Sequence, residues 1–158
     1  MIRLFLYSFE GNRRYISDVL YSKVKALAGG DEILKTEEGK PYLLSGKFYF
    51  SISHTDSLGI LAVSDKDVGV DAESKDRTVS EGVGKRFLGG RKDITEWVHF
   101  EAFSKLMGEG ISIGYEKMKE TVHNCAEFEI FGHRVCVCSF GDITLSVVEA
   151  EVVSHPAS

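Results

Sequence analysis

The chain has 158 residues and carries 19 basic and 24 acidic side chains, which gives a formal net charge of −5. This length allows one domain with a buried core, and the acidic balance argues against a general nucleic-acid binder, which is normally basic. No stretch approaches the length of a transmembrane helix, and residues 2–9 are too short and alternating for a signal-peptide core. We therefore expect a cytoplasmic protein that binds neither nucleic acid nor membranes.

The first part of the chain predicts a strand, a helix and a second strand. Residues 2–9 alternate in the manner of a strand, and residues 12–28 place apolar side chains at helical spacing before Gly29-Gly30 ends the helix. A turn follows at Glu38 to Pro41, and residues 47–53 alternate again as a strand.

The second part predicts a β-hairpin, two helices and a strand meander. The hairpin joins residues 58–64 to residues 68–73 through a polar turn. Apolar residues at helical spacing mark one helix over 77–88 and a second from about Thr95 to Met107. The core face of the second helix consists of Phe100, Phe103, Leu106 and Met107. The antiparallel meander spans residues 127–131, 134–140 and 143–153.

This order of elements predicts an α+β fold with antiparallel sheets and packed helices, because strands and helices do not alternate as in a βαβ array. No Pro/Ser-rich linker interrupts the chain, so we expect a single domain over residues 1–158. A two-part pattern divides that domain into pseudo-twofold halves, a short first half over residues 1–58 and a second half over residues 59–153.

Three carboxylates in two short motifs are the main candidates for chemistry. Asp71 and Glu73 lie two apart at the end of an apolar strand and should face the same way. Glu101 and Lys105 lie four apart and should share a helix face. A polar strand edge and an ordinary surface ion pair are the alternatives for each motif taken alone. Because the apolar run before Asp71 should be buried, like charges delivered there favour a bound cation, and oxygen ligands suit Mg²⁺.

The segment from Ser51 to Thr55 combines hydroxyl groups with a histidine at the end of a strand. It is either a capped strand end with a solvent-facing His54 or a contact for phosphate. Basic residues gather at two other places, for which a solvated charged face is the alternative. The first group is Arg13, Arg14, Lys23 and Lys25. The second surrounds residues 87–90, where basic and exposed apolar side chains together suit an acidic protein partner; it consists of Lys85, Arg86, Arg91 and Lys92.

The three cysteines, Cys125, Cys136 and Cys138, are odd in number and lack the spacing of a disulfide framework. We therefore expect free thiols in a reducing compartment. His123 and His133 lie near them in the sequence, but the spacing matches no standard zinc signature. We expect Cys136 and Cys138 to be small core residues rather than metal ligands.

Taken in order, these pieces resemble the Sfp-type 4′-phosphopantetheinyl transferases, of which this chain would be a short member. That family shows a Gly-Lys-Pro turn, a Ser-His-Ser-like strand end, a (V/I)-G-(V/I)-D-x-E strand and a W-x-x-K-E-A-x-x-K helix followed by glycines. An arginine often follows the strand motif, and Arg77 stands at that position here. The four motifs keep their order and spacing at Gly39 to Pro41, Ser53 to Thr55, Val68 to Glu73 and Trp97 to Lys105.

The resemblance implies transfer of the 4′-phosphopantetheine arm of coenzyme A to a serine of an acyl- or peptidyl-carrier protein. It implies Asp71, Glu73 and Glu101 around Mg²⁺, with Glu101 as the base for the serine hydroxyl. Lys105 would contact the diphosphate and stabilise the leaving 3′,5′-ADP, so Glu101 and Lys105 are the expected catalytic residues. The expected contacts to the phosphates of coenzyme A are Lys40, His54, and Arg13 or Arg14.

One position departs from the family pattern. Phe100 stands where the family carries a lysine, so one cation near the phosphates is missing. We expect Phe100 to pack on the apolar face of its helix, which predicts a working but slower transferase. The alternatives are a non-catalytic protein that binds coenzyme A or a carrier protein on the same fold, and a Mg²⁺-dependent phosphohydrolase.

Overall fold

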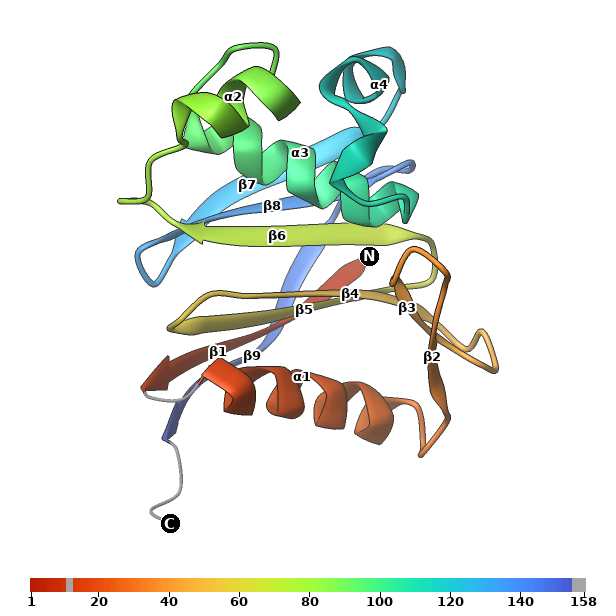
Figure 1. Ribbon diagram of the computed structural model, residues 1–158. Helices are drawn as coiled ribbons and strands as arrows, with labels where there is room; N and C mark the ends of the chain where they lie inside the picture. Colours follow the sequence, from red (N-terminus) through yellow and green to blue (C-terminus); the bar gives the residue numbers. More distant parts are fainter. Residues whose placement is uncertain (11–12, 155–158) are drawn as a thin grey trace.

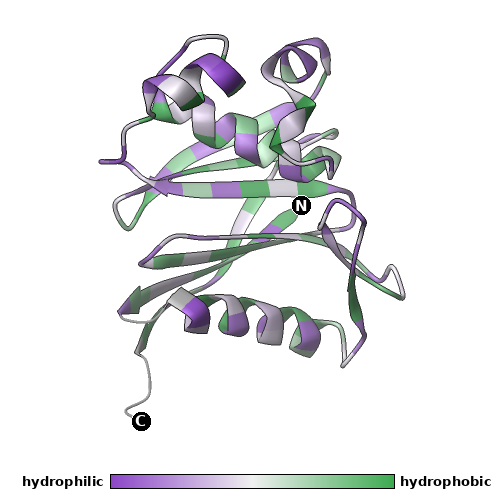
Figure 2. Cartoon of the chain, in the orientation of Figure 1, coloured by the Kyte–Doolittle hydropathy of each residue, from purple (hydrophilic) through white to green (hydrophobic). Residues whose placement is uncertain are grey.

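The structure is a computed structural model that describes residues 1–10 and 13–154, apart from the side chains of residues 13 and 154. Four layers are stacked on one another: a helix, a four-stranded sheet, a three-stranded sheet and a group of helices (Figure 1). The α+β class predicted from the sequence is confirmed. Hydrophobic residues concentrate in the two central sheets, and hydrophilic residues are frequent on the outer helices (Figure 2).

The first sheet pairs its strands in the order β4-β5-β1-β9, and α1 (Arg13–Leu27) covers its outer face. Alternation along the strands divides the side chains between two cores. In β1, Leu4 and Leu6 point toward the second sheet, whereas Phe5 and Tyr7 pack under α1. The strands are β1 (Ile2–Glu10), β4 (Tyr49–His54), β5 (Leu58–Ser64) and β9 (Leu145–Ser154).

The second sheet has the order β6-β8-β7 and carries α3 (Ile94–Met107) on its outer face. Val68, Val70 and Ala72 of β6 point into the core between the two sheets. The opposite face of β6, which bears Asp71, therefore lies toward α3. The strands are β6 (Val68–Ser74), β7 (Asn124–Ile130) and β8 (His133–Ser139).

The smaller elements lie around these layers. A two-stranded ribbon follows α1, and two short helices and a 3₁₀ turn flank α3. Their bounds are β2 (Ile33–Lys35), β3 (Pro41–Leu43), α2 (Glu81–Phe87), η1 (Ile111–Ile113) and α4 (Tyr115–Glu120).

Two predicted strand pairings are wrong. Residues 58–73 form no hairpin, because β5 already has β4 on one edge and β1 on the other, and β6 continues into the second sheet. The expected meander ends after β7 and β8, since β9 returns to the first sheet and pairs with β1 in parallel. Both errors arise because pairing depends on which strand edges remain free in the assembled fold.

Serine side chains join the two sheets where β4 runs beside β6. The amide N–H of Val70 donates to Ser51 Oγ at 3.1 Å, and that of Ala72 donates to Ser53 Oγ at 3.1 Å. Both serines are buried. They therefore satisfy backbone donors on an edge of β6 where no strand pairs, which a buried edge requires.

Gly69 determines how closely α3 approaches β6. A Cβ atom placed on Gly69 would lie 2.1 Å from the carbonyl oxygen of Ala102 and 2.5 Å from the amide nitrogen of Leu106. Both atoms belong to the helix backbone, so they cannot move aside as the end of a side chain would. The absence of a side chain at Gly69 thus sets the distance between the helix and the strand.

We expect Gly69→Ala to lower the free energy of unfolding by about 1–3 kcal/mol, because the methyl group overpacks two backbones. Gly82→Ala is the matched control, since a Cβ at Gly82 meets no atom within 4 Å and a helical Gly→Ala change stabilises by about 0.5–1 kcal/mol. Urea unfolding of both variants measures the difference. Equal stability of the two variants would contradict the close approach.

Candidate functional site

Three carboxylates converge where α3 crosses β6. Asp71 and Glu73 lie on the face of β6 that α3 covers, and Glu101 projects from α3. Each offers a carboxylate oxygen, and these oxygens lie within 4.8 Å of one another. The prediction that Asp71 and Glu73 face the same way and meet Glu101 is confirmed.

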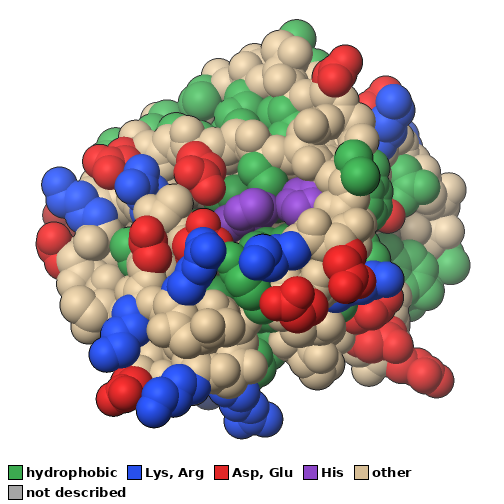
Figure 3. Space-filling model, turned by 90° about the horizontal axis from the view of Figure 1, so that it is seen from above, with side chains coloured by type: hydrophobic (Ala, Val, Ile, Leu, Met, Phe, Trp, Pro, Cys, Tyr) green, Lys and Arg blue, Asp and Glu red, His purple; other side chains and the backbone are tan. Residues whose placement is uncertain are grey.

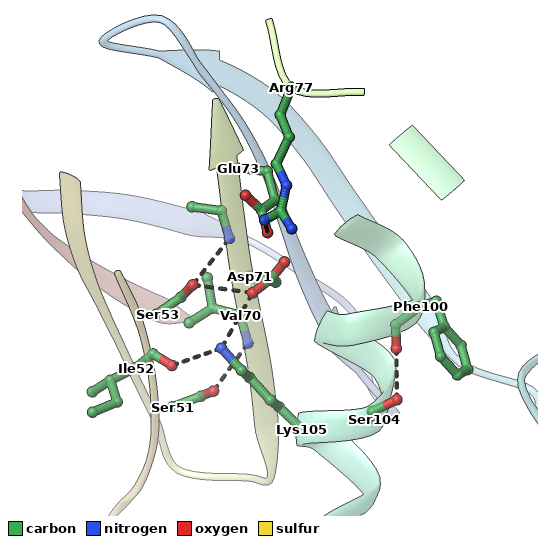
Figure 4. A network of polar contacts seen from close by, with 11 residues as sticks. Ser51, Ile52, Ser53, Val70, Asp71, Glu73, Arg77, Phe100, Ser104 and Lys105 are labelled. Carbon is green, nitrogen blue, oxygen red and sulfur yellow. Dashed lines mark hydrogen bonds and ion pairs between the residues drawn. The ribbon is translucent and has the colours of Figure 1, made fainter. Parts of the chain in front are cut away.

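Asp71 lies at the centre of this cluster (Figure 4). Its Oδ1 accepts hydrogen bonds from Ser53 Oγ at 3.1 Å and from Lys105 Nζ at 3.2 Å. Lys105 Nζ also donates to the carbonyl oxygen of Ile52 at 3.0 Å, so it links α3 to β4. The expectation that Asp71 lies at the end of the strand is wrong, because Asp71 is buried in the middle of β6 and only 3% exposed.

The second oxygen of Asp71 is buried and has no hydrogen-bond partner among the described residues. A buried carboxylate oxygen without a donor is costly. This oxygen, together with the carboxylates of Glu73 and Glu101, offers the hard ligands that Mg²⁺ takes in proteins. The residues of the cluster therefore fit a divalent cation.

Glu73 is paired with an arginine four residues further along the chain. Arg77 Nη1 lies 2.6 Å from Glu73 Oε1. The hydrogen bond and the charge of Glu73 raise the pKa of Arg77. The Arg77 side chain is exposed, so its guanidinium stands at the outer side of the carboxylate cluster (Figure 4).

The pKa of Glu101 is raised by its burial close to two other acidic groups. Burial, followed by the charge of Asp71, raises the pKa of Glu101 from 4.5 to about 9, while Lys105 acts in the opposite direction. Near neutral pH Glu101 thus retains its proton. A cation at this position would remove the cause of the shift.

Two surface cavities flank the carboxylate cluster. The first, of about 340 Å³, is lined by Glu101 and Lys105 together with apolar side chains that include Phe50, Ile52 and Ile111. The second, of about 560 Å³, has a polar lining that carries charges of both signs. Its lining includes His54, Thr55, Glu73, Arg77 and His133. Because Glu101 lines one cavity and Glu73 the other, the cluster lies between them.

The expected phosphate contacts are distributed unevenly over these cavities. Lys40 lines the first cavity, but its Nζ is paired with Asp67 Oδ1 at 2.8 Å and donates to the Leu106 carbonyl at 3.0 Å. Arg14 lies exposed on α1 and is not among the described residues that line either cavity. The Arg13 side chain lies outside the described residues, so its role stays a prediction.

The hydroxyl-rich strand end has a structural role that sequence reasoning missed. Ser51 and Ser53 bond to β6, so the interpretation of their hydroxyls as phosphate contacts is wrong. His54 remains at the second cavity. His133, which was not predicted as a site residue, contacts Thr55 Oγ1 through Nε2 at 2.8 Å and borders the same cavity. Only the pairing of β8 with β6 brings His133 there, and no local sequence pattern indicates that pairing.

The basic group around residues 87–90 lacks the exposed apolar side chains that were expected. Leu88 is fully buried and Phe87 is partly buried against the core under α3. Arg86 lies over the Phe87 ring, and Lys85 pairs with Glu81 within α2. The surface there is a charged helix face rather than a mixed apolar patch.

Phe100 packs in the core, as its helical position predicts. Its side chain is fully buried, and its ring lies 6.3 Å from the Phe87 ring and 6.0 Å from the Trp97 ring. Figure 4 places it on the opposite side of α3 from Asp71. A side chain at position 100 therefore points away from the carboxylate cluster.

Comparison with known proteins adds no family assignment. No protein-family model matches the chain, and no curated protein matches it. Within the described residues, no helix combines the length and the apolar character needed to cross a membrane. The resemblance to phosphopantetheinyl transferases thus stays a prediction that rests on the motifs.

The raised pKa of Glu101 predicts a pH-dependent stability in metal-free buffer. Between pH 4.5 and about 9 the folded chain holds a proton at Glu101 that the unfolded chain has lost, so this contribution to stability falls as pH rises. Glu101→Gln mimics the protonated form and should remove that part of the slope. Urea unfolding in EDTA between about pH 5 and pH 9 measures it. Parallel curves for wild type and variant would refute the assignment.

Phe100→Lys should destabilise the fold rather than add a cation to the site. It removes an aromatic side chain from the core and buries an ammonium group, which should cost about 3–5 kcal/mol or more. Phe100→Leu is the control, with an expected loss of about 1–2 kcal/mol. A stable Phe100→Lys protein would show that position 100 reaches solvent.

Proposed function

We propose that this chain transfers the 4′-phosphopantetheine arm of coenzyme A to a serine of an acyl- or peptidyl-carrier protein in the presence of Mg²⁺. The observation that carries the proposal is the convergence of Asp71, Glu73 and Glu101, with Lys105 on Asp71, between two cavities. The order and spacing of the four sequence motifs support the same assignment.

Asp71, Glu73 and Glu101 would hold Mg²⁺. The Asp71 oxygen without a donor could bind the cation, and the cation would also oppose the charge of Asp71, which together with burial raises the pKa of Glu101. When bound, Mg²⁺ supplies charge neutralisation for the diphosphate of coenzyme A. A diphosphate could not approach three carboxylates without that compensation.

The two cavities suit the two ends of coenzyme A. The phosphorylated nucleoside end accepts hydrogen bonds through its phosphate oxygens, which favours the cavity where His54, Arg77 and His133 offer donors beside the carboxylates of Asp56 and Glu73. The pantetheine arm is uncharged and largely apolar, which favours the cavity beside Phe50 and Ile52. This orientation lays the diphosphate across the carboxylate cluster and beside Lys105.

The reaction then follows from the positions of two side chains. The serine oxygen of the carrier protein bonds to the phosphorus that bears the pantetheine arm, and the bond from that phosphorus to the oxygen of 3′,5′-ADP breaks. Glu101 accepts the serine proton, directly or through water. The Lys105 side chain is 36% exposed, and its Nζ stabilises the negative charge that develops on the leaving 3′,5′-ADP.

The burial of Phe100 bears on the alternative of a non-catalytic binding protein. That alternative would be favoured if Phe100 removed a cation that the family lysine places near the phosphates. Since Phe100 packs in the core on the far side of α3, its identity removes no cation from the carboxylate cluster. No other observation favours binding without transfer.

Incubation with Mg²⁺, coenzyme A and a panel of apo-carrier proteins, followed by intact mass, tests the proposal. Wild type should add one phosphopantetheine group to at least one carrier protein. Asp71→Asn should reduce the rate by about 100-fold or more, because it removes a ligand charge while it keeps the volume of the side chain. Asp65→Asn, in the exposed turn after β5, is the control and should match wild type.

Two results would contradict the proposal in different ways. Unchanged transfer by Asp71→Asn would remove the carboxylate cluster from the mechanism. Mg²⁺-dependent binding of coenzyme A by wild type, measured by calorimetry, without transfer to any carrier protein would favour the non-catalytic alternative.

A further inference from the structure

A second cluster of ligand atoms lies on a different side of α3. We propose that His99, His123, Cys125 and Cys138 form a structural Zn²⁺ site. One ligand atom from each of these residues lies within 4.8 Å of the other three. This site shares no residue with the carboxylate cluster and is independent of the proposed transfer reaction.

The contacts within this cluster are short and involve the ligand atoms themselves. His99 Nε2 lies 2.8 Å from His123 Nε2 and 2.9 Å from Cys125 Sγ, and Cys125 Sγ lies 3.0 Å from Cys138 Sγ. In a tetrahedral zinc site, bond lengths of about 2.0–2.3 Å place the ligand atoms about 3.3–3.8 Å apart. These three separations are a few tenths of an ångström shorter than that range, and all four ligand atoms lie within 4.8 Å of one another, so small shifts of the side chains would admit the ion.

The fold assembles these ligands from three separate segments. Cys125 of β7 and Cys138 of β8 stand directly opposite each other in the antiparallel register. His99 projects from α3, which covers this sheet, and His123 immediately precedes β7. The ligands therefore lack the spacing of a zinc signature, which explains why the sequence pattern indicated no site.

The surroundings of His123 favour metal binding. Its Nδ1 lies 2.7 Å from the carbonyl oxygen of Thr121. A carbonyl oxygen only accepts hydrogen bonds, so Nδ1 carries the proton and Nε2 presents a lone pair to the cluster. Histidine ligands of metals are commonly oriented by such a bond from the other ring nitrogen. The Phe103 ring, 4.7 Å away, packs against the imidazole and restrains its orientation.

The chemistry of the four ligands selects the metal. Two thiolates and two imidazoles are the set that Zn²⁺ takes in closed tetrahedral sites, whereas Mg²⁺ prefers oxygen. Four protein ligands leave no open position, so the site is structural. It would attach α3 to β7 and β8, and His99 lies two residues before Glu101.

The cluster is accessible to a metal ion from the side of the helices. Cys125 is exposed, and both histidines are partly exposed. Figure 3 shows two histidine side chains next to each other at the surface of that face, among acidic and basic side chains. Cys136 does not belong to this group of mutually close ligand atoms, although its Sγ lies 3.8 Å from Cys138 Sγ. His133 contacts Thr55, away from this cluster.

A disulfide between Cys125 and Cys138 is the competing interpretation. Their sulfur atoms are 3.0 Å apart and both residues are free cysteines, whereas a disulfide bond is about 2.05 Å long. A disulfide would also leave the two histidines facing each other without a cation between them. The metal site accounts for all four side chains.

Metal analysis of the purified full-length chain tests the site. After Zn²⁺ loading under reducing conditions and gel filtration, wild type should retain one zinc ion per chain. Substitution with Co²⁺ should produce visible bands of tetrahedral cobalt and a thiolate charge-transfer band in the near ultraviolet. Cys125→Ser and His123→Gln should each lower zinc affinity by about 100-fold or more. Chelation should lower the Tm of wild type by several degrees and leave that of Cys125→Ser unchanged.

Two control variants define the site and separate it from the carboxylate cluster. Cys136→Ala should keep the zinc, because its sulfur is outside the ligand set, and Asp71→Asn should keep it as well. The proposal would be overturned if wild type retained no zinc. It would also be overturned if Cys136→Ala lost zinc to the same extent as Cys125→Ser. So would intact mass under non-reducing conditions that finds Cys125 and Cys138 oxidised to a disulfide in metal-free protein.

Discussion

The close contact between α3 and β6 is the constraint on which the rest of this structure depends. Gly69 allows the helix backbone to rest directly on the strand. Two residues further on the same face, Asp71 is then covered by α3 and meets Glu101 and Lys105. Close packing of the helix on the strand therefore has an electrostatic consequence, because the same contact also buries carboxylates of like charge.

Local sequence patterns predicted which side chains share a face of one strand or helix. They failed to predict how the strands pair, because pairing involves several elements at once. The period of β6 predicted that Asp71 and Glu73 share a face, and the period of α3 predicted a buried Phe100. Strand pairing could not be read in this way, since it depends on which edges remain free. The role of Ser53 was missed for that reason, because it requires β4 beside an unpaired edge of β6.

The two ligand clusters of α3 are separated by helix geometry and by chemistry. His99 and Glu101 lie two residues apart, about 200° around the helix, so their side chains leave in nearly opposite directions. Carboxylate oxygens favour a hard ion such as Mg²⁺, whereas thiolate and imidazole favour Zn²⁺. In the proposals made above, one helix would therefore carry ligands for two metals without either site competing for the ion of the other.

The charges around Asp71 connect metal binding to substrate binding. Lys105 pairs with Asp71 and Arg77 pairs with Glu73, whereas Glu101 forms no ion pair within residues 1–10 and 13–154. Burial is the main cause of the raised pKa of Glu101, and this imbalance adds to it through the charge of Asp71. A diphosphate would add further negative charge to a cluster that already lacks positive charge, so it could bind only together with a cation. The cation, in turn, would bind more tightly once the diphosphate supplies additional oxygen ligands. Such coupling is reciprocal, and it makes the Mg²⁺ complex of coenzyme A, rather than either component alone, the species that this site is suited to bind.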